Sequence, residues 1–338
     1  MLIVRPSTFS DLASIEKLAN QNSAKISSLP QQRDKLSEQI DISTRSFAGD
    51  ESLAGVEQYL LVLEDSESGG VLGTAGIDRC AGNGHPFYNY RQDELIHSSH
   101  QLNVNNKVPV LYMSHELTGK TLFRSLTIDS KYRGTEYFEL ISRARLLLVG
   151  QFSELFDDEI VIEIQGALDD DGTCPFWDSV GRHFFDMDFA TADYYSAIKS
   201  KTFIAELMPS HPIYVPLLSE AAQAVVGKPH PLAEPNCQLL HREGFRIGKY
   251  ADIFDGGPTL TARVSDLNTV KSLQTKHVKV SESTRGGVKY LISNGSVSNF
   301  RCVIGQLTDG IGDVIRISQA LAKALNVSER ENITFAAL

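Results

Sequence analysis

Histidine is the side chain of this sequence best suited to move a proton near neutral pH, because unperturbed imidazole titrates at about pH 6.5. Among the nine histidines, His230 differs from the rest because it lies between two prolines, in the segment Gly-Lys-Pro-His-Pro, which stiffens its backbone. His115, His183 and His211 compete with it for a catalytic role. From the residues alone, a surface or packing role is more frequent for any one histidine, so His230 is a candidate for acid or base catalysis.

A second pattern is suited to binding an anion. A strand expected at residues 120–129 leads through a polar loop, residues 130–136, into a helix expected from Tyr137 to Phe156. A loop that opens a helix presents free N–H groups and the positive end of the helix dipole, and Arg133 adds a charge there. Because many strand–loop–helix units bind nothing, this spacing alone is a weak indication of phosphate binding.

The cysteines and the acidic residues do not indicate a metal site. Cys80, Cys174, Cys237 and Cys302 lie far apart, with no CxxC and no Cys/His spacing typical of zinc, so we expect reduced, partly buried thiols. The segment Asp169–Gly172 holds three successive acids, but it lacks the alternating oxygen ligands and the distal glutamate of a calcium loop. We expect it to be a solvated turn.

Composition argues against several classes of function. The 338 residues include 32 Lys and Arg against 42 Asp and Glu, a net charge of −10, so a nucleic-acid backbone would be repelled on average. No window approaches the ~20 apolar residues of a membrane span, and the apolar stretch at the start is too short for a signal peptide. We therefore expect a cytoplasmic protein that binds neither nucleic acid nor membrane.

The elements that must position these residues alternate between strand and helix. Residues 79–108, rich in Asn, His and Gly, are expected to form an excursion over the surface or over a site. The order of elements predicts an α/β (α+β) protein with a mixed central sheet and flanking helices. Strands are expected at Ile3–Pro6, Tyr59–Glu64, Val71–Asp78, Val110–Met113 and Glu159–Ile164, and a further helix from about Ser10 to Asn20.

Beyond about residue 265 the pattern of expected elements changes. Short strands at residues 278–280, 289–292 and 300–304 alternate with Gly/Ser/Asn turns, and a helix at Ser318–Leu325 and a strand at Asn332–Ala337 close the chain. We therefore expect two domains, residues 1–265 and a smaller β-rich C-terminal domain, residues 266–338.

Longer motifs resemble those of one family. The order of elements over residues 1–165 resembles the GNAT fold of acyl-CoA N-acyltransferases. In that fold the strand before such a loop presents backbone groups to the pantetheine arm, and the loop holds the pyrophosphate. Residues 179–189 (SVGRHFFDMDF), 201–209 (KTFIAELMP), 211–214 (HPIY) and 252–260 (DIFDGGPTL) resemble, in type and order, the arginine N-succinyltransferase family. The resemblance extends with interruptions from residue 1 to about 265, and more loosely to the end.

This resemblance implies an acyltransferase that moves the succinyl group of succinyl-CoA to the α-amine of L-arginine. The products would be N2-succinylarginine and coenzyme A, in the first step of arginine catabolism by the succinyltransferase pathway. Succinyl-CoA would be a co-substrate, with no tightly bound cofactor and no metal. The family's proton donor, the histidine of an H-P motif, matches His230. The backbone of Leu126 would pair with the acyl-CoA, and Arg133 and Gly134 would hold its pyrophosphate.

An arginine acceptor requires carboxylates around its planar guanidinium. Asp252 and Asp255, which precede two glycines, could supply them, although the same residues could form only a tight turn. His211 is expected either at a turn or at the wall of the amino-acid pocket. The succinyl carboxylate needs a further cation, which the sequence does not single out among 32 Lys and Arg.

One departure from the family pattern keeps other functions open. Where the family's loop usually has glycines, this chain has Glu136 and Phe138, and a glutamate carboxylate would repel a pyrophosphate. The alternatives are transfer to ornithine or another amine, and a non-catalytic sensor of an amino acid or acyl-CoA. A third is a partner subunit for a related active chain. The resemblance also implies a homo-oligomer or a pairing with a homologous subunit.

Overall fold

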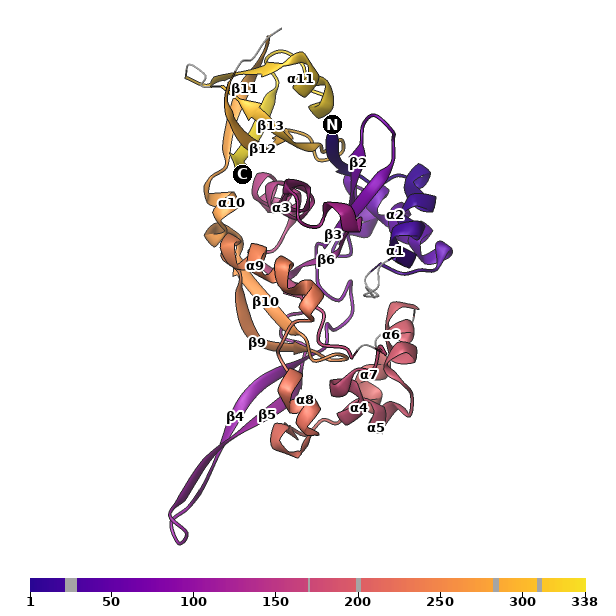
Figure 1. Cartoon of the computed structure of the whole chain (residues 1–338), viewed down its shortest axis with the longest axis vertical. Coiled ribbons are helices and arrows are strands. Elements are labelled where there is room, and N and C mark those ends of the chain that lie inside the picture. Colours follow the sequence, from indigo (N-terminus) through magenta and orange to yellow (C-terminus); the bar gives the residue numbers. More distant parts are fainter. Residues whose placement is uncertain (22–28, 170, 199–201, 282–285, 309–311) are drawn as a thin grey trace. The chain divides into compact units, whose positions relative to one another are not determined.

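The computed structural model describes residues 1–21, 29–169, 171–198, 202–281, 286–308 and 312–338, so Asp170 of the acidic turn and Lys201 of one family motif lie outside it. The chain divides into two compact units (Figure 1). Unit 1 combines residues 1–80, 121–160 and 263–338, and unit 2 combines residues 81–120 and 161–262. Both ends of the chain therefore belong to unit 1. The division expected at residue 265 stays a prediction.

Unit 1 is built on a mixed sheet with the strand order β14-β11-β15-β12-β13-β1-β2-β3-β6. Its neighbouring strands are antiparallel except β11 and β14, which are parallel. The strands from the first part of the chain are β1 (Leu2–Pro6), β2 (Gln58–Asp65), β3 (Val71–Asp78) and β6 (Thr121–Ile128). Those from the last part are β11 (Gln274–Ser281), β12 (Val288–Asn294), β13 (Cys302–Leu307), β14 (Val314–Ser318) and β15 (Asn332–Ala337). The expected strands are thus present, and β14 is one that the sequence did not reveal.

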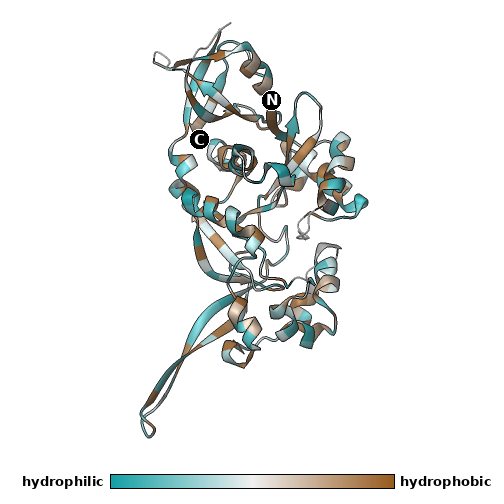
Figure 2. Ribbon diagram, in the orientation of Figure 1, coloured by the Kyte–Doolittle hydropathy of each residue, from teal (hydrophilic) through white to brown (hydrophobic). Residues whose placement is uncertain are grey.

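Strand β2 is buried on both faces, which explains its continuous apolar sequence. Leu60 and Val62 pack against helices α1 (Leu12–Gln21) and α2 (Arg33–Phe47). The intervening Leu61 points to the opposite face and is also fully buried. That face is covered by α3. Figure 2 shows the amphipathic character of α1 and α2, in which hydrophobic and hydrophilic segments alternate.

Helix α3 (Glu136–Gln151) is the expected long helix of unit 1, but it is shorter than predicted. The prediction that it continues to Phe156 is wrong, because Phe152 leaves the helical conformation with φ −128° and ψ 51°. Residues Ser153–Leu155 then form a separate 3-10 turn. The remaining helices of unit 1 are α10 (Asn268–Lys271) and α11 (Gln319–Leu325).

Unit 2 has an antiparallel sheet with the order β10-β9-β4-β5-β8. Strand β7 (Glu159–Glu163) spans the boundary between the two units along the chain. The strands of unit 2 are β4 (Asn89–Ser99), β5 (Val104–Ser114), β8 (Ile213–Tyr214), β9 (Arg246–Asp252) and β10 (Pro258–Arg263). Its helices are α4 (Pro175–Ser179), α5 (Arg182–Phe185), α6 (Phe189–Ile198), α7 (Thr202–Leu207), α8 (Glu220–Val225) and α9 (Glu234–Glu243).

Within the excursion expected over residues 79–108, residues 89–108 belong to a regular hairpin that the sequence did not reveal. Strands β4 and β5 form a long hairpin whose eleven residue pairs run without a bulge from Asn89–Ser114 to Ser99–Val104. Most residues of its distal part are exposed, so no alternation of apolar and polar residues marks it in the sequence.

The core of unit 2 is aromatic. Trp177 and Phe176 are fully buried, with the Trp177 ring stacked on Phe254 at a centroid distance of 5.6 Å. Phe176 in turn makes an edge contact with Tyr90 of β4 at 5.9 Å. This cluster anchors the base of the β4–β5 hairpin to the helices of unit 2. Over the whole described chain, no helix has the length and apolar character needed to cross a membrane.

Candidate functional site

His230 lies in unit 2, where it begins the 3-10 helix η6 (Pro231–Ala233). Its backbone N–H donates to the carbonyl of Gln165 at 2.8 Å. Its ring nitrogen Nδ1 accepts a hydrogen bond from the N–H of Leu232 at 3.1 Å. Because a backbone N–H only donates, Nδ1 carries no proton, and the neutral ring holds its proton on Nε2. In this neutral ring the Nε2–H is the donor that His230 offers to other groups.

Burial also distinguishes His230 from the other histidines. All nine lie in the described part of the chain, and eight are exposed, among them His115, His183 and His211. His230 alone is partly buried. Its catalytic role stays a prediction, and partial burial is the property that sets its imidazole apart.

The loop that precedes His230 is tied to the turn of the Asp-Gly-Gly motif. The N–H of Gly227, whose φ is +71°, donates to the carbonyl of Gly256 at 2.8 Å. The structure therefore brings together the expected proton-transfer residue and the segment that contains Asp252 and Asp255. By contrast, His211 is exposed, lies just before β8, and has no hydrogen bond or ion pair with these residues in the part of the chain described.

Asp255 is a buried carboxylate that holds the turn together. Its Oδ2 accepts from the N–H of Gly166, and its Oδ1 from the N–H of Gly257, each at 2.8 Å. Burial, together with the nearby charge of Asp252, raises the pKa of Asp255 well above its usual range. Asp252 is half-buried, and its Oδ1 accepts from the N–H of Phe254 at 2.7 Å. Backbone N–H groups thus hold both carboxyl groups, which also interact with each other, and their binding of a guanidinium stays a prediction.

Close packing explains the two glycines that follow Asp255. A Cβ on Gly257 would come within 2.1 Å of the carbonyl oxygen of Ile164. Gly256 has a φ of +68°, and a Cβ there would lie 2.8 Å from the ring of Phe176. The motif therefore encodes a turn pressed against β7 and the aromatic core.

In unit 1, strand β6 contains a bulge at Ser125 and Leu126. Two residues of β6 lie opposite Ala75 of β3, because the pairing shifts by one between Thr74–Thr127 and Gly76–Arg124. Ser125 is buried with a φ of +53°, a conformation that non-glycine residues rarely adopt. Its carbonyl accepts from the hydroxyl of Thr74 at 2.8 Å. Bulges of this kind re-aim backbone groups beside binding sites.

The loop after β6 is exposed and ordered by its own hydrogen bonds. Thr135 caps α3, because its hydroxyl accepts from the N–H of Tyr137 at 3.3 Å. Arg133 and Gly134 are both exposed just before this cap. A Cβ added to Gly134 would meet nothing within 4 Å, and its φ is not positive. The fold itself therefore does not require glycine at this position.

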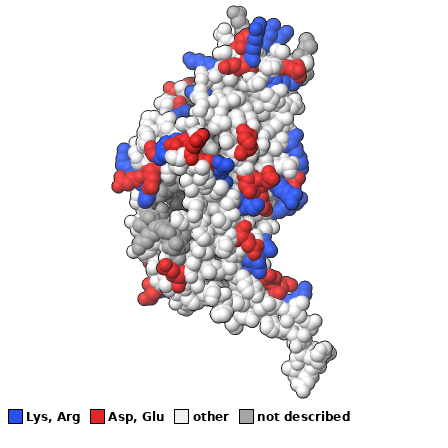
Figure 3. Space-filling model, turned by 180° about the vertical axis from the view of Figure 1, so that it is seen from behind, with Lys and Arg blue, Asp and Glu red and all other residues white. Residues whose placement is uncertain are grey.

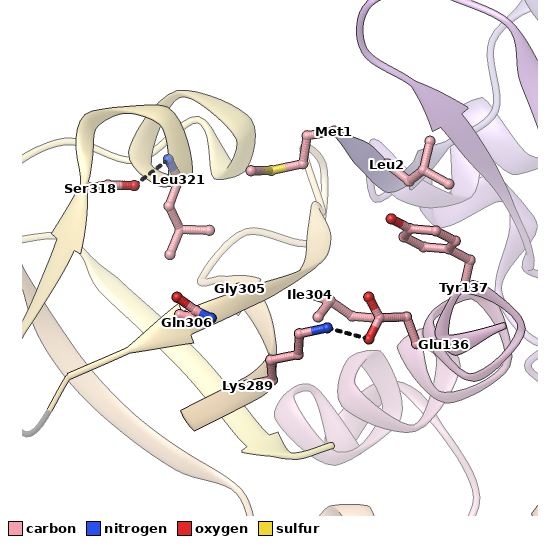
Figure 4. Close-up of a pocket in the computed structure, with 10 residues that line it drawn as sticks. All are labelled: Met1, Leu2, Glu136, Tyr137, Lys289, Ile304, Gly305, Gln306, Ser318 and Leu321. Atoms are coloured by element: carbon pink, nitrogen blue, oxygen red, sulfur yellow. Dashed lines mark hydrogen bonds and ion pairs between the residues drawn. The ribbon is translucent and has the colours of Figure 1, made fainter. Parts of the chain in front are cut away.

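The glutamate expected to repel a phosphate is neutralised within unit 1. Glu136 forms an ion pair with Lys289 of β12, with 2.7 Å between Oε2 and Nζ (Figure 4). It is also the first residue of α3, where the helix dipole stabilises a carboxylate. A cavity of about 330 Å³ lies beside this pair, lined by apolar residues such as Met1, Ile304 and Leu321 (Figure 4). The charge of Glu136 is therefore offset by a residue from the last part of the chain.

Arg145 is an unusual residue of α3 that sequence reasoning missed. Its side chain is fully buried, and among the described residues no carboxylate forms an ion pair with it. Burial lowers its pKa to about 9. Its guanidinium lies 4.5 Å from the ring centroid of Phe123 in β6, and its Nε donates to the carbonyl of Ser142 at 3.1 Å. The sequence signal that could have revealed this buried arginine was a charged residue inside the apolar run of a helix.

The expected residues fall into two groups. Leu126, Arg133 and Gly134 lie in unit 1, and His211, His230, Asp252 and Asp255 lie in unit 2. No group of three or more His, Cys, Asp or Glu suited to a metal ion occurs among the described residues.

Comparison with known proteins gives matches along the whole chain. The family model described as "Arginine N-succinyltransferase beta subunit" matches residues 2–269, and that of its C-terminal domain matches residues 274–337. Arginine N-succinyltransferase subunit alpha of Pseudomonas aeruginosa is 41% identical over 338 residues and covers 100% of both chains. Arginine N-succinyltransferase of Yersinia pestis is 37% identical and covers 100% of this chain and 98% of the relative.

The fold agrees with that of a solved relative. The structure of arginine/ornithine succinyltransferase subunit AI from Pseudomonas aeruginosa matches with a TM-score of 0.91 and 38% sequence identity. The match covers 100% of this chain and 98% of that one. The expected mixed α/β sheet with flanking helices is thereby confirmed.

Proposed function

Because the chain belongs to the arginine N-succinyltransferase family, as its motifs predicted, we propose that it transfers the succinyl group of succinyl-CoA to the α-amine of L-arginine. The products are N2-succinylarginine and coenzyme A. The observation that supports this most strongly is the identity of 41% over the full length of both chains. The four free cysteines are typical of a reducing compartment, which supports a cytoplasmic location.

His230 is proposed as the proton donor. The neutral amine attacks the thioester carbonyl, a C–N bond forms, and the C–S bond then breaks. Overall the nitrogen loses a proton and the sulfur gains one. To give Nε2–H to the sulfur, His230 must act as the imidazolium, so in this proposal the ring takes up the proton that the nitrogen loses and passes one on to the sulfur. The hydrogen bond from Leu232 to Nδ1 then describes the neutral ring that remains after donation.

The backbone of Leu126 is proposed to pair with the acyl-CoA. The bulge supports this proposal, since it takes Ser125 and Leu126 out of the regular ladder with β3. The ion pair between Arg124 and Asp78, both nearly buried, holds the strand beside the bulge. Backbone donors held in this way can stabilise the oxyanion of a tetrahedral intermediate at little reorganisation cost.

Arg133 and Gly134 are proposed to hold the pyrophosphate at the start of α3. The open space in front of Gly134 supports this role, since a phosphate can approach a glycine backbone closely. The pairing of Glu136 with Lys289 removes most of the repulsion expected from the departure in the family pattern. Gly134→Ala should therefore weaken succinyl-CoA binding while leaving the free energy of unfolding within ~0.5 kcal/mol of the wild type.

Asp252, Asp255 and His211 are proposed to contribute to the acceptor site. Asp255 has both carboxylate oxygens engaged by backbone N–H groups, so its contribution is to fix the turn that carries Asp252. The half-buried Asp252 is the better candidate for direct contact with a guanidinium. His211 is exposed and would line the entrance to this site.

An acceptor other than arginine is the second candidate. The solved relative is described as an arginine/ornithine succinyltransferase, which favours ornithine as an alternative acceptor. Two relatives are described as subunits, so we also propose that this chain works in an assembly, either with copies of itself or with a homologous partner subunit.

The test is the release of free thiol from succinyl-CoA by the purified protein. Rates are measured without acceptor, with L-arginine and with L-ornithine, and acetyl-CoA replaces succinyl-CoA as the control for acyl selectivity. Release that depends on arginine and is much weaker with ornithine or acetyl-CoA supports the proposal. No release from a protein that still binds acyl-CoA or arginine would overturn it and favour a sensor or a partner subunit.

A further inference from the structure

We propose that the distal part of the β4–β5 hairpin, residues 92–109, is a dimerisation arm that pairs along β4 with the arm of a second copy of this chain. The proposal deepens the assembly suggested above, and it does not depend on the reaction catalysed. It rests on the pairing, the exposure and the charge of the arm.

Among the described residues, no strand pairs with the outer edges of the arm. Strand β4 pairs with β9 only at Asn89, Tyr90 and Arg91. Strand β5 pairs with β8 only at Val110 and Leu111. Beyond these positions, the described strands 92–99 and 104–109 pair only with each other. Each therefore presents an open row of backbone N–H and C=O groups.

The arm lacks most of the features that protect open edges in monomeric proteins. Such edges are normally blunted by charged residues, prolines or bulges. The ladder of the arm is regular, and its distal charges are limited to Asp93 and the exposed pair of Glu94 and Lys107, 3.4 Å apart. Proline occurs on β5, at Pro109, whereas residues 92–99 of β4 contain none. The β4 edge is thus the one open to pairing along its whole length.

The surface of the arm is apolar or uncharged. Ile96, Leu102 and Val104 have exposed fractions of 67%, 75% and 41%. Residues 95–106 contain no Lys, Arg, Asp or Glu. Figure 3 shows the projecting end of the arm as an uncharged surface, whereas charged side chains are scattered over other parts of the face shown. A two-stranded ribbon of this kind is at best marginally stable in water, so further burial is expected.

Charge and symmetry identify a second copy as the occupant. A chain with a net charge of −10 repels its own copies, and the arm offers a long segment without that repulsion. Two β4 edges related by a two-fold axis pair antiparallel, which makes the interface self-complementary. An axis near Ile96 or His97 sets Asp93 and Glu94 of one copy against uncharged or histidine residues, 98–101, of the other.

The experiment compares the mass in solution of three proteins by light scattering over a range of concentrations. In the first variant, Ile96→Lys, two like charges face each other at the axis and two apolar side chains are lost from the interface. The matched control is Val288→Lys, which changes an equally exposed residue of unit 1 (64%) in the same way. We expect a mass of two chains, or a multiple of two, for the wild type and the control. For Ile96→Lys we expect the dimer dissociation constant to rise about 100-fold.

A second variant tests the arm as a whole. Asp93 and Val110 lie opposite each other, so an Asn-Gly turn can join them and replace residues 94–109. This shortened chain keeps the aromatic anchor of the hairpin and should have the mass of one chain. A wild type that has the mass of one chain at every concentration overturns the proposal, as does an Ile96→Lys variant that keeps the mass of two.

Thiol release is measured on the same samples, so that failure of this proposal is distinguished from failure of the proposed function. An active wild-type monomer overturns the proposal of a dimerisation arm and leaves the acyltransferase proposal intact. A dimer that depends on the arm but releases no thiol supports the arm proposal and overturns the acyltransferase proposal.

Discussion

Replacing His230 separates its chemical task from its structural one. The ring offers Nε2–H to the substrate in the proposed mechanism, and its Nδ1 caps η6 by accepting from the N–H of Leu232 at 3.1 Å. Asparagine can accept the same hydrogen bond through Oδ1, because it is among the best capping residues, but it provides no imidazole. His230→Asn therefore removes the proton donor and keeps the cap, whereas His230→Ala removes both.

The two effects differ enough in size to be measured independently. Loss of a positioned general acid lowers turnover by roughly 10²–10⁴-fold, or about 2.7–5.4 kcal/mol in the activation free energy. Loss of one partly exposed capping hydrogen bond lowers the free energy of unfolding by about 0.5–1.5 kcal/mol. Both variants should therefore lose turnover to a similar extent. Only His230→Ala should lose stability, and the dissociation constant of succinyl-CoA should change less than about twofold in either.

The assays are thiol release at saturating succinyl-CoA and L-arginine, unfolding in urea, and calorimetric titration with succinyl-CoA. Turnover of His230→Asn above one tenth of the wild-type value would refute the assignment of His230 as donor. Equal loss of stability in the two variants would refute the capping geometry from which the position of the proton was inferred.

Three further predictions concern charges in unit 1. Because Arg145 is buried and no acid partner lies among the described residues, Arg145→Met should raise the free energy of unfolding by about 1–3 kcal/mol. A lower thermal midpoint would contradict this. Burial alone would raise the pKa of Asp11, but hydrogen bonds, chiefly from Arg5, more than offset this and lower it. Asp11→Asn should therefore cost about 1–2 kcal/mol at neutral pH. Since a lowered pKa stabilises the fold above the unfolded value of 3.8, urea unfolding should show this difference vanish as the pH falls below it. Lys289→Met should raise the KM for succinyl-CoA about two- to fivefold, because it leaves Glu136 unpaired. Adding Glu136→Gln should restore the KM. A double variant with a KM no lower than that of Lys289→Met would exclude this electrostatic cause.

The sequence predicted best those elements whose burial leaves a pattern. The continuous apolar run of β2 follows from burial of both faces, so Leu60–Leu63 marked a strand clearly. The β4–β5 hairpin was missed because exposed strands need no such pattern. The end of α3 was placed too late, because Phe152 has the spacing of a helical residue and leaves the helix only in the folded chain.

At the candidate site, the sequence named residues whose roles stay proposals, and it did not predict their geometry. The flanking prolines and the H-P motif indicated His230, but the hydrogen bond that fixes its tautomer depends on the turn formed by Leu232. The bulge of β6 places Ser125 at a φ of +53°, a conformation for which serine gives no signal. The partner of Glu136 was equally hidden, since Lys289 lies 153 residues further along the chain.

The position of β1 in the sheet of unit 1 has a consequence for the biosynthesis of the protein. One neighbour, β2, follows soon in the sequence, but the other, β13, pairs with β1 through Cys302 opposite Val4. At a translation rate of roughly 5–20 residues per second, β1 therefore waits about 15–60 s for the strand that covers its second edge. During that time a nascent chain offers an uncovered strand to other nascent chains or to a chaperone. Messages truncated before β13 should accordingly yield aggregates rather than a folded fragment.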